Sequence, residues 1–352
     1  ICAAEPATDD NSRVVSACLP GSARSMRLRD LIAGLDARAP DALLDADVRA
    51  VTDDSREVRP GSLFVARRGT RVDGREFIAV AIQSGAAAVA MEPGSTLPEG
   101  APIVLTADAA LLLAVAAERI HGSPTSKMRV AGVTGTNGKT TVSFLLRRIL
   151  EESGRRCGLV STVRIDAGEQ GGVLEKATMT TPGAPALAAM LGEIASRGCD
   201  SVVVETSSHA LEQKRVAGVR YRVGVFTNLT GDHLDYHGTM EAYAAAKAKL
   251  FESLSEDGFA VVNADDPMSE RMLRYRGGMI ALRTGGRPKS RRRNAINAAG
   301  TVLGASRDGT DLRLTGPWGD IRVRIPLIGA HNVMNALESA AAAYALGAGA
   351  DA

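Results

Sequence analysis

The feature that most constrains this sequence is a glycine-bracketed turn within residues 130–150, VAGVTGTNGKTTVSFLLRRIL. The apolar run before the turn is typical of a buried parallel strand, and apolar residues recur at helical spacing after it. Gly135 and Gly138 let backbone N–H groups point into a concavity at the helix N-terminus, which favours an anion. Lys139 is placed to reach the β- and γ-phosphates of a nucleotide, and the Thr140 hydroxyl to bind Mg²⁺. The turn therefore predicts a nucleotide-phosphate site.

The generic phosphate-loop motif G-x-x-x-x-G-K-[ST] is not met in full. Val133 stands where the first glycine belongs, and Gly132 comes one residue early. An ordinary glycine-rich turn between a strand and a helix is the alternative. The Lys-Thr pair directly after Gly138 favours phosphate binding.

Composition narrows the classes of function. Among 352 residues, 42 basic and 40 acidic side chains leave a net charge of +2, which indicates no global bias toward nucleic acid or a membrane surface. Aromatic residues make up 3%, too few for a base-stacking surface, and no apolar run approaches a membrane span. The four cysteines lack C-x-x-C or zinc spacing, which predicts free thiols in a reducing cytoplasm. We interpret the basic run 287–293 as a solvated loop.

Chain length and a linker predict two domains. Gly, Ser, Pro and Thr cluster at residues 121–128, just before the strand of the phosphate loop. We expect a small α/β domain over residues 26–122 and a doubly wound, mostly parallel sheet over residues 128–352, with residues 1–25 as an extension. Alternating apolar and polar residues around Gly316–Gly319 predict a C-terminal antiparallel hairpin. Other strands are expected at 63–66, 87–91, 103–106, 158–162, 201–205, 223–227 and 259–263.

Polar side chains follow two of the predicted strands at their carboxyl ends, where an open α/β sheet binds ligands. Glu205 comes directly after SVVV and can hold Mg²⁺ opposite Thr140; a capping or surface glutamate is the alternative. The next strand is followed by Asp232, His233, Asp235 and His237. Because no cysteine accompanies them, His233 fits a second Mg²⁺ better than a zinc site. For His237, a turn or helix-capping role fits the sequence at least as well as a catalytic role.

A resemblance to a known family rests on several strings. They are GTNGKTT, TTP at Thr180–Pro182, ETSSHALEQKR, TNLTGDHLDYHGTMEAYAAAKAKLF and GAHNVMN. Together they resemble the Mur ligase family of peptidoglycan synthesis, and within it the tripeptide synthetases. Residues 53–89 resemble the uridine-diphosphate-binding N-terminal domain of those enzymes. The resemblance covers nearly all of residues 26–352, although each string alone is shared with sister ligases or folylpolyglutamate synthetases.

The resemblance implies an ATP-dependent ligase with Mg²⁺. ATP would phosphorylate the D-Glu carboxylate of UDP-N-acetylmuramoyl-L-Ala-D-Glu, and a diamino acid (meso-diaminopimelate, else L-lysine) would attack the acyl phosphate. The implied ATP contacts are Gly135, Thr136, Asn137, Gly138, Lys139, Thr140, Thr141, Asn332 and Asn335, with Thr140, Glu205 and His233 serving the metal. The implied substrate contacts are Asp53, Ser55, Thr70, Arg71, Val72, Thr180, Thr181, Ser207, Gln213 and Arg215. We expect a cytoplasmic monomer with no nucleic-acid partner and no membrane insertion.

Lys247 is a further candidate. Helical spacing places it on one face with Tyr243 and Leu250, so it can share buried neighbours. By the resemblance, it matches a lysine that CO₂ converts to a carbamate, an anionic oxygen ligand for Mg²⁺. Burial and the charge of Lys139 would lower the pKa of its amine and favour that reaction. Lys249 is expected to be an ordinary surface lysine.

Nothing in the sequence resembles the third, C-terminal domain that Mur ligases close over ATP. We therefore expect either the first two domains of the enzyme or a non-catalytic module that binds ATP and a UDP-sugar. The complete set of Lys139, Glu205, His233 and Lys247 favours the enzyme. A folylpolyglutamate-type ligase is a third possibility, which the uridine-type N-terminal domain disfavours.

Overall fold

The computed structural model describes residues 25–69, 72–94, 100–168, 172–176, 179–274, 277–284 and 295–351. The chain divides into two compact units, Ile1–Ala116 and Ala117–Ala352. The division falls inside a helix a few residues before the linker expected at 121–128. The basic run 287–293 and residues Thr70 and Arg71 lie outside the described residues, as does all but the last residue of the expected 1–25 extension.

The first unit is a small α/β domain, as predicted. Its main sheet has the order β2-β7-β6-β5-β4, in which β4 to β7 pair in parallel and β2 is antiparallel to β7. Every residue of β5 and β6 is buried, which explains why these strands read as continuous apolar runs. The elements are β1 (Met26–Arg27), α1 (Leu28–Ile32), β2 (Ala37–Arg38), α2 (Asp41–Leu44), β3 (Asp47–Val48), β4 (Ala50–Thr52), η1 (Ser55–Glu57), β5 (Ser62–Ala66), η2 (Gly74–Phe77), α3 (Ile78–Gln83), β6 (Ala88–Met91), β7 (Ile103–Thr106) and α4 (Ala109–Ile120).

The second unit contains a large mixed sheet. Within the described residues its order is β11-β10-β9-β12-β8-β13-β14-β15-β16-β17-β18, with parallel pairing from β9 to β16. Its first elements are η3 (Pro124–Ser126), β8 (Arg129–Thr134), α5 (Lys139–Glu152), β9 (Cys157–Val160), β10 (Arg164–Asp166), β11 (Val173–Lys176), α7 (Ala184–Ser196), β12 (Ser201–Glu205), α8 (Ser208–Glu212) and β13 (Tyr221–Phe226). The remainder are α9 (Leu234–His237), α10 (Met240–Glu252), β14 (Leu254–Asn263), η4 (Ser269–Arg274), β15 (Gly278–Thr284), β16 (Ile296–Ser306), β17 (Gly309–Gly316), β18 (Gly319–Ile325) and α11 (His331–Ala345).

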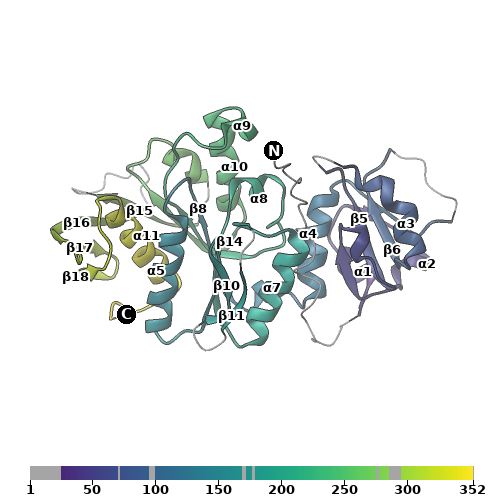
Figure 1. The fold of residues 1–352 in the computed structure, drawn as a ribbon, viewed down its shortest axis with the longest axis horizontal. Coiled ribbons are helices and arrows are strands. Elements are labelled where there is room, and N and C mark those ends of the chain that lie inside the picture. Colours follow the sequence, from purple (N-terminus) through teal and green to yellow (C-terminus); the bar gives the residue numbers. More distant parts are fainter. Residues whose placement is uncertain are drawn as a thin grey trace, which may run out of the picture. The chain divides into compact units, whose positions relative to one another are not determined.

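Helices cover both faces of this sheet, so the predicted doubly wound architecture is confirmed. In Figure 1, α5 and α11 lie on one side of the central strands, and α7, α8 and α10 lie on the other. Two separate apolar clusters fill the two interfaces, one around Leu146 and Leu337, the other around Leu191 and Tyr243. The helices of the second unit therefore hold the carboxyl ends of the parallel strands in fixed positions.

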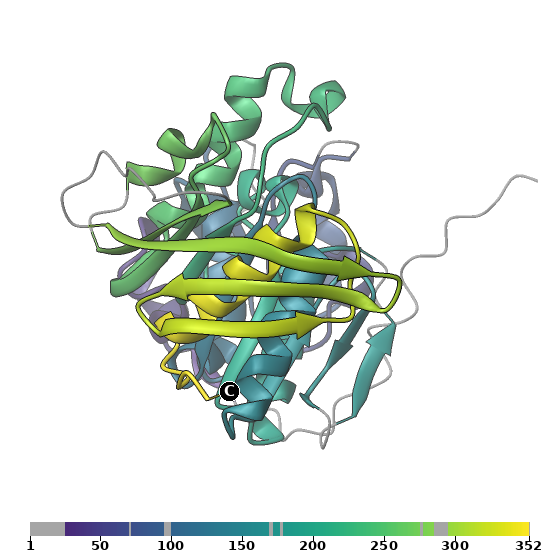
Figure 2. The same ribbon diagram turned by 90° about the vertical axis from the view of Figure 1, so that its left-hand side faces the viewer.

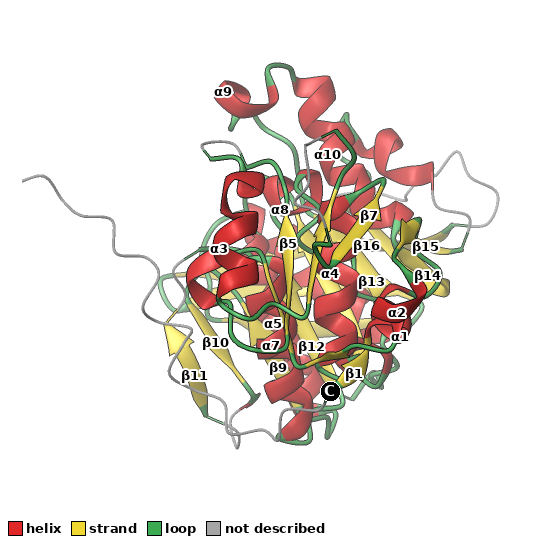
Figure 3. Cartoon of the chain, turned by 90° about the vertical axis from the view of Figure 1, so that its right-hand side faces the viewer, coloured by secondary structure: helices red, strands yellow, loops and turns green. Residues whose placement is uncertain are grey.

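Antiparallel strands finish the sheet at both edges. The predicted hairpin is β17–β18, with Gly316 paired to Gly319 across its turn, and Figure 2 shows β16, β17 and β18 running across α11. At the opposite edge, β10 and β11 lie beside β9 (Figure 3), where the sequence pattern had indicated no strands. A buried ion pair of 2.8 Å between Arg147 of α5 and Asp166 anchors β10. Among the described helices, none is both long and apolar enough to cross a membrane.

Candidate active site

The turn between β8 and α5 has the backbone of an anion-binding loop. Gly135 has φ +148° and Gly138 has φ +88°, values that residues with side chains rarely adopt. A Cβ at Gly135 would lie 1.8 Å from Thr227 Oγ1, and one at Gly138 would lie 2.6 Å from Asn335 Oδ1. Both glycines are thus required by conformation and by space. The helix dipole of α5 then begins at Lys139 and favours a negative group in front of it.

A second loop, after β13, fastens this turn, and sequence reasoning missed its role. Thr227 Oγ1 donates to Asn137 O at 2.6 Å, and the Asn137 amide donates to Asn228 Oδ1 at 3.0 Å. The Thr230 amide donates to Thr136 Oγ1, also at 3.0 Å. The polar string Thr-Asn-Leu-Thr directly after an apolar strand was the available signal. These bonds fix the shape of the phosphate loop.

Two lysine amines converge on one carbonyl of the phosphate loop. Lys139 Nζ donates to Gly135 O at 3.0 Å and to Thr136 O at 2.8 Å, and Lys247 Nζ donates to Gly135 O at 2.9 Å. Burial lowers the pKa of Lys139, opposed by the charges of Glu205 and Asp232. Burial, and then the charge of Lys139, lowers the pKa of Lys247 to about 6. Lys247 is therefore mainly a neutral amine at pH 7.

Glu205 ends β12 and is fully buried. Its Oε2 accepts a hydrogen bond from Thr162 Oγ1 at 2.8 Å, whereas Oε1 has no hydrogen-bond partner among the described residues. A buried carboxylate oxygen without a partner is costly unless a cation takes that place. In proteins, Mg²⁺ is usually held by one or two carboxylates together with phosphate oxygens. The carboxylate of Glu205 is therefore a suitable ligand for Mg²⁺. No group of three or more His, Cys, Asp or Glu side chains in the described part of the chain forms a closed metal site.

Three of the five histidines gather beside these groups. The ring of His209 lies 4.9 Å from that of His233 and 5.5 Å from that of His237 between centroids. His233 has φ +52°, about half of its side chain is exposed to solvent, and its Nε2 lies 3.5 Å from Asp232 Oδ2. Burial lowers the pKa of both His209 and His237, with the neighbouring histidines adding to the effect. His209 and His237 are thus biased toward the neutral imidazole form.

Asn335 borders a polar cleft of about 640 Å³ beside the phosphate loop, whereas Asn332, the other asparagine expected to bind ATP, is not among the residues that line it. Asn335 Nδ2 donates to Asn332 Oδ1 at 2.8 Å, and Asn332 Nδ2 donates to Ile328 O at 2.9 Å. The volume suits a drug-sized ligand such as a nucleoside. Sequence reasoning found Asn137, Gly138, Thr141 and Asn335 but missed Asn228, Thr230, Asn263, Asp265, Thr284, Ala330, His331 and Met334, which also line the cleft. Thr140 is the second residue of α5 and is partly buried.

The residues expected to bind substrate in this unit also come together. The Ser207 amide donates to Thr181 Oγ1 at 3.0 Å, and Thr180 Oγ1 lies 3.3 Å from Thr162 Oγ1, a residue that sequence reasoning missed. Arg215 donates to Gln213 Oε1 through Nε and Nη2, at 3.0 and 2.6 Å, and to Thr181 O through Nη1 at 3.1 Å. The guanidinium is held in a fixed orientation next to the carboxyl end of β12.

The candidates in the first unit follow the ends of β4 and β5. Asp53 Oδ2 accepts from Arg67 Nε at 2.6 Å, a partner that the sequence did not indicate. Ser55 begins η1, and the side chain of Val72 is 53% exposed. Parallel strands place their carboxyl ends at one edge of the sheet, so these residues share that edge.

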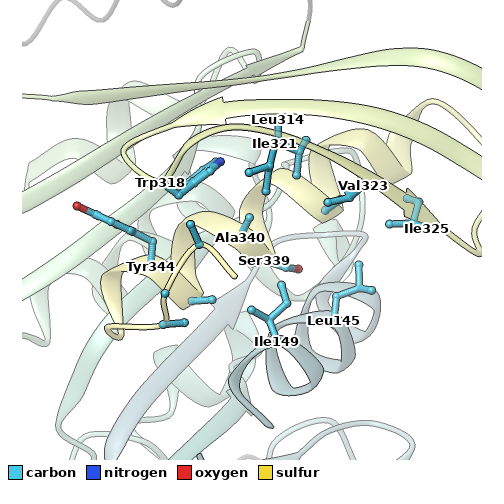
Figure 4. Close-up of a pocket in the computed structure, with 15 residues that line it drawn as sticks. Leu145, Ile149, Leu314, Trp318, Ile321, Val323, Ile325, Ser339, Ala340 and Tyr344 are labelled. Carbon is cyan, nitrogen blue, oxygen red and sulfur yellow. The ribbon is translucent and has the colours of Figure 1, made fainter. Parts of the chain in front are cut away.

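A second hollow in the second unit lacks the groups for catalysis. It measures about 170 Å³ and lies between the β17–β18 hairpin and helices α5 and α11. Figure 4 shows Trp318, Ile321 and Val323 facing Leu145 and Ile149 across it. No ionisable side chain other than that of Tyr344 lines it, so the polar cleft is the better candidate for chemistry.

Two family models match the chain. The Mur ligase middle domain matches residues 133–343, and the catalytic domain of the Mur ligase family matches residues 47–128. The first match spans more than half of the chain. The chain belongs to the Mur ligase family. The resemblance seen in its motifs is thereby confirmed.

This Mur ligase has similar relatives under two names. It is 40% identical over 340 residues to a protein of Alkalilimnicola ehrlichii named UDP-N-acetylmuramoyl-L-alanyl-D-glutamate--2,6-diaminopimelate ligase. It is 39% identical over 330 residues to a Deinococcus radiodurans protein named UDP-N-acetylmuramyl-tripeptide synthetase. Each alignment covers 92% of this chain, but 65% and 64% of the relatives. The chain thus spans less than two thirds of their length.

Solved structures agree with the fold of this Mur ligase. One described as a UDP-N-acetylmuramoyl-L-alanyl-D-glutamate--2,6-diaminopimelate ligase is 28% identical, with a TM-score of 0.74 over 92% of this chain and 64% of that chain. One described as a UDP-N-acetylmuramoylalanyl-D-glutamyl-2,6-diaminopimelate--D-alanyl-D-alanyl ligase from Acinetobacter baumannii is 19% identical, with a TM-score of 0.58 over 94% of this chain and 68% of that chain. The second similarity concerns the fold alone.

Proposed function

We propose that this protein is an ATP-dependent amide ligase that acts in the cytoplasm. Its substrates would be UDP-N-acetylmuramoyl-L-Ala-D-Glu and a diamino acid, meso-diaminopimelate or L-lysine. The observation that carries the proposal is the meeting of the Lys139 and Lys247 amines at Gly135 O, where Glu205 acts electrostatically on Lys139. A module that only binds nucleotides needs no second buried lysine at its phosphate loop. The names of the relatives support the choice of substrates.

The groups at this site suit phosphoryl transfer to a carboxylate. The phosphate loop would hold ATP by its N–H groups, and Lys139 would offset charge as two anions approach. Mg²⁺, when bound, would offset more of that charge; Thr140, Glu205 and His233 would hold it, with Lys247 as a carbamate. The D-Glu carboxylate oxygen would attack the γ-phosphorus, ADP would leave, and the diamino acid amine would then displace phosphate from the acyl phosphate. Arg215, Ser207 and Thr181 would orient the acceptor.

An assay of the full-length gene product tests the reaction. With ATP, Mg²⁺, the UDP-muramyl dipeptide and either diamino acid, we expect ADP, phosphate and a UDP-muramyl tripeptide identified by mass. Lys139→Ala should lower the rate by about a hundredfold or more, the scale for removing one preorganised electrostatic group. Borohydride reduction during turnover should trap the acyl phosphate as an alcohol. ATP consumption that does not depend on the dipeptide would contradict the proposal.

Arg215→Ala should weaken binding of the UDP-muramyl dipeptide to residues 1–352. The expected loss is about 1.5–3 kcal/mol, the scale of hydrogen bonds to a charged group. Binding of ATP with Mg²⁺ should change little, because the guanidinium of Arg215 is held by Gln213 and Thr181 in the segment expected to bind the dipeptide. Titration calorimetry measures both affinities.

Arg215→Lys is the matched control for charge. Lysine keeps the positive charge but lacks the planar fork, so it should recover only part of the affinity. Equal losses for ATP and for the dipeptide would instead assign Arg215 a purely structural role.

A further inference from the structure

Tyr243 of α10 contacts the phosphate loop and Lys247 at the same time. Its side chain is 1% exposed, and its hydroxyl lies 3.3 Å from Thr136 Oγ1. Lys247 Nζ lies 4.3 Å from the centre of its ring. A phenol ring buried beneath an amine limits where that amine can go, and the hydroxyl holds the loop on the other side.

The same ring is linked to the segment expected to bind substrate. His237 stacks on Tyr243, with centroids 5.0 Å apart and planes inclined by 30°. The Nε2 atom of His237 lies 3.0 Å from Oγ of Ser208, the first residue of α8 and the neighbour of Ser207. Tyr243 therefore touches groups from the phosphate loop, from its own helix and, through His237, from α8.

We propose that Tyr243 is a positioning residue for the ligase reaction, a role that rests on the proposed function. Its hydroxyl sets the position of Thr136, and so of the loop that receives the nucleotide phosphates. Its ring sets the position of the Lys247 side chain. The two parts of one side chain thus act on different steps, the hydroxyl on ATP binding and the ring on turnover.

Tyr221 offers a matched control for a merely structural role. Both tyrosines belong to the same apolar cluster, and Tyr221 is fully buried. Its hydroxyl lies 3.1 Å from Thr206 Oγ1, as that of Tyr243 lies near Thr136. Tyr221→Phe therefore removes a comparable buried hydroxyl–threonine contact that does not involve the phosphate loop.

The experiment compares these variants in the full-length protein. Tyr243→Phe should raise the KM for ATP by about three- to tenfold, the range of one neutral hydrogen bond, and leave kcat within about twofold. Tyr243→Leu should in addition lower kcat by about tenfold or more, because Lys247 loses the aromatic ring that fixes the position of its amine. Tyr221→Phe should leave both kinetic constants within about twofold, whatever it does to the melting temperature.

A double-mutant cycle with Thr136→Ala keeps the test decisive even if Tyr243→Leu fails to fold. If the hydroxyl acts through Thr136, adding Tyr243→Phe to Thr136→Ala should raise the KM for ATP no further. Additive effects, or equal effects of Tyr243→Phe and Tyr221→Phe, would overturn the inference. ATP affinities of the same variants are also measured by calorimetry. Absent ligase activity would then refute the proposed function, while the affinities still decide the role of the hydroxyl.

Discussion

Replacing Lys247 by alanine is expected to lower the ligase activity of the full-length protein by about a hundredfold or more. This is the scale of removing one charged group preorganised for the transition state. Lys247 is 1% exposed, and its amine donates to Gly135 O at 2.9 Å, inside the phosphate loop. A residue so placed affects the site where ATP reacts. The initial rate of tripeptide formation is the measurement.

The loss should follow from a missing carbamate. Burial and the charge of Lys139 lower the pKa of Lys247 from 10.5 to about 6, so above pH 6 the amine is mainly neutral. The neutral nitrogen can attack CO₂, forming an N–C bond and releasing one proton, which leaves an anionic carbamate. Such an oxygen donor suits Mg²⁺. The modification should therefore decline as the pH falls through about 6, because the protonated amine has no lone pair.

Formate tests this explanation directly. In Lys247→Ala, a small carboxylate can occupy the position of the lost carbamate, so added formate should restore part of the activity. Lys249→Ala is the matched control on the same helix, since Lys249 is 40% exposed and pairs with Glu212 at 2.8 Å. It should keep full activity. Undiminished activity of Lys247→Ala, together with an unmodified amine at Lys247 in well-resolved electron density of the active enzyme, would refute the carbamate.

Replacing Glu338 by methionine is expected to stabilise the second unit. Glu338 lies in α11 and is fully buried, and neither carboxyl oxygen has a hydrogen-bond partner among the described residues. A buried polar group without a partner costs about 1–3 kcal/mol, and methionine fills a similar volume without that cost. The melting temperature should therefore rise by about 2–4 °C for each kcal/mol gained. Calorimetry or circular dichroism measures the shift.

The stability gained by Glu338→Met should depend on pH. Burial alone raises the pKa of Glu338 well above its usual 4.5. The folded protein then keeps a proton that the unfolded chain releases above pH 4.5, so this residue lowers stability progressively as the pH rises from 4.5 toward the folded-state pKa. The advantage of Glu338→Met over the parent protein should grow over the same range.

Two controls separate charge from size. Glu338→Gln should remove this pH dependence but gain less stability, because its amide also lacks a partner. Glu241→Gln changes an exposed glutamate at the start of α10 and should shift the melting temperature very little. A destabilised Glu338→Met with an unchanged pH profile would mean that the carboxyl group has a partner in solution.

The elements predicted well are those whose signals are local. The phosphate loop, the strand ending at Glu205 and the hairpin around Trp318 each depend on a few consecutive residues. Strands β10, β11, β15 and β16 were not predicted; of these, β10 and β11 are short and pair at an edge of the sheet. Asp166 in β10 gave no strand signal because its burial depends on Arg147, 19 residues earlier.

The same distinction between local sequence signals and long-range contacts applies to the candidate site. The sequence by itself determined the family. It also predicted the glycines of the phosphate loop and the lysine, acid and histidine proposed beside it, since these are read from contiguous motifs. Only the tertiary structure decided that Lys139 and Lys247 meet at Gly135 O, although Lys247 lies 112 residues from that glycine. It alone decided that the Lys247 amine lies 4.3 Å from the centre of the Tyr243 ring, and that the buried carboxyl group of Glu338 has no hydrogen-bond partner among the described residues. Desolvation depends on everything that packs around a group, and most of those neighbours lie far away along the chain.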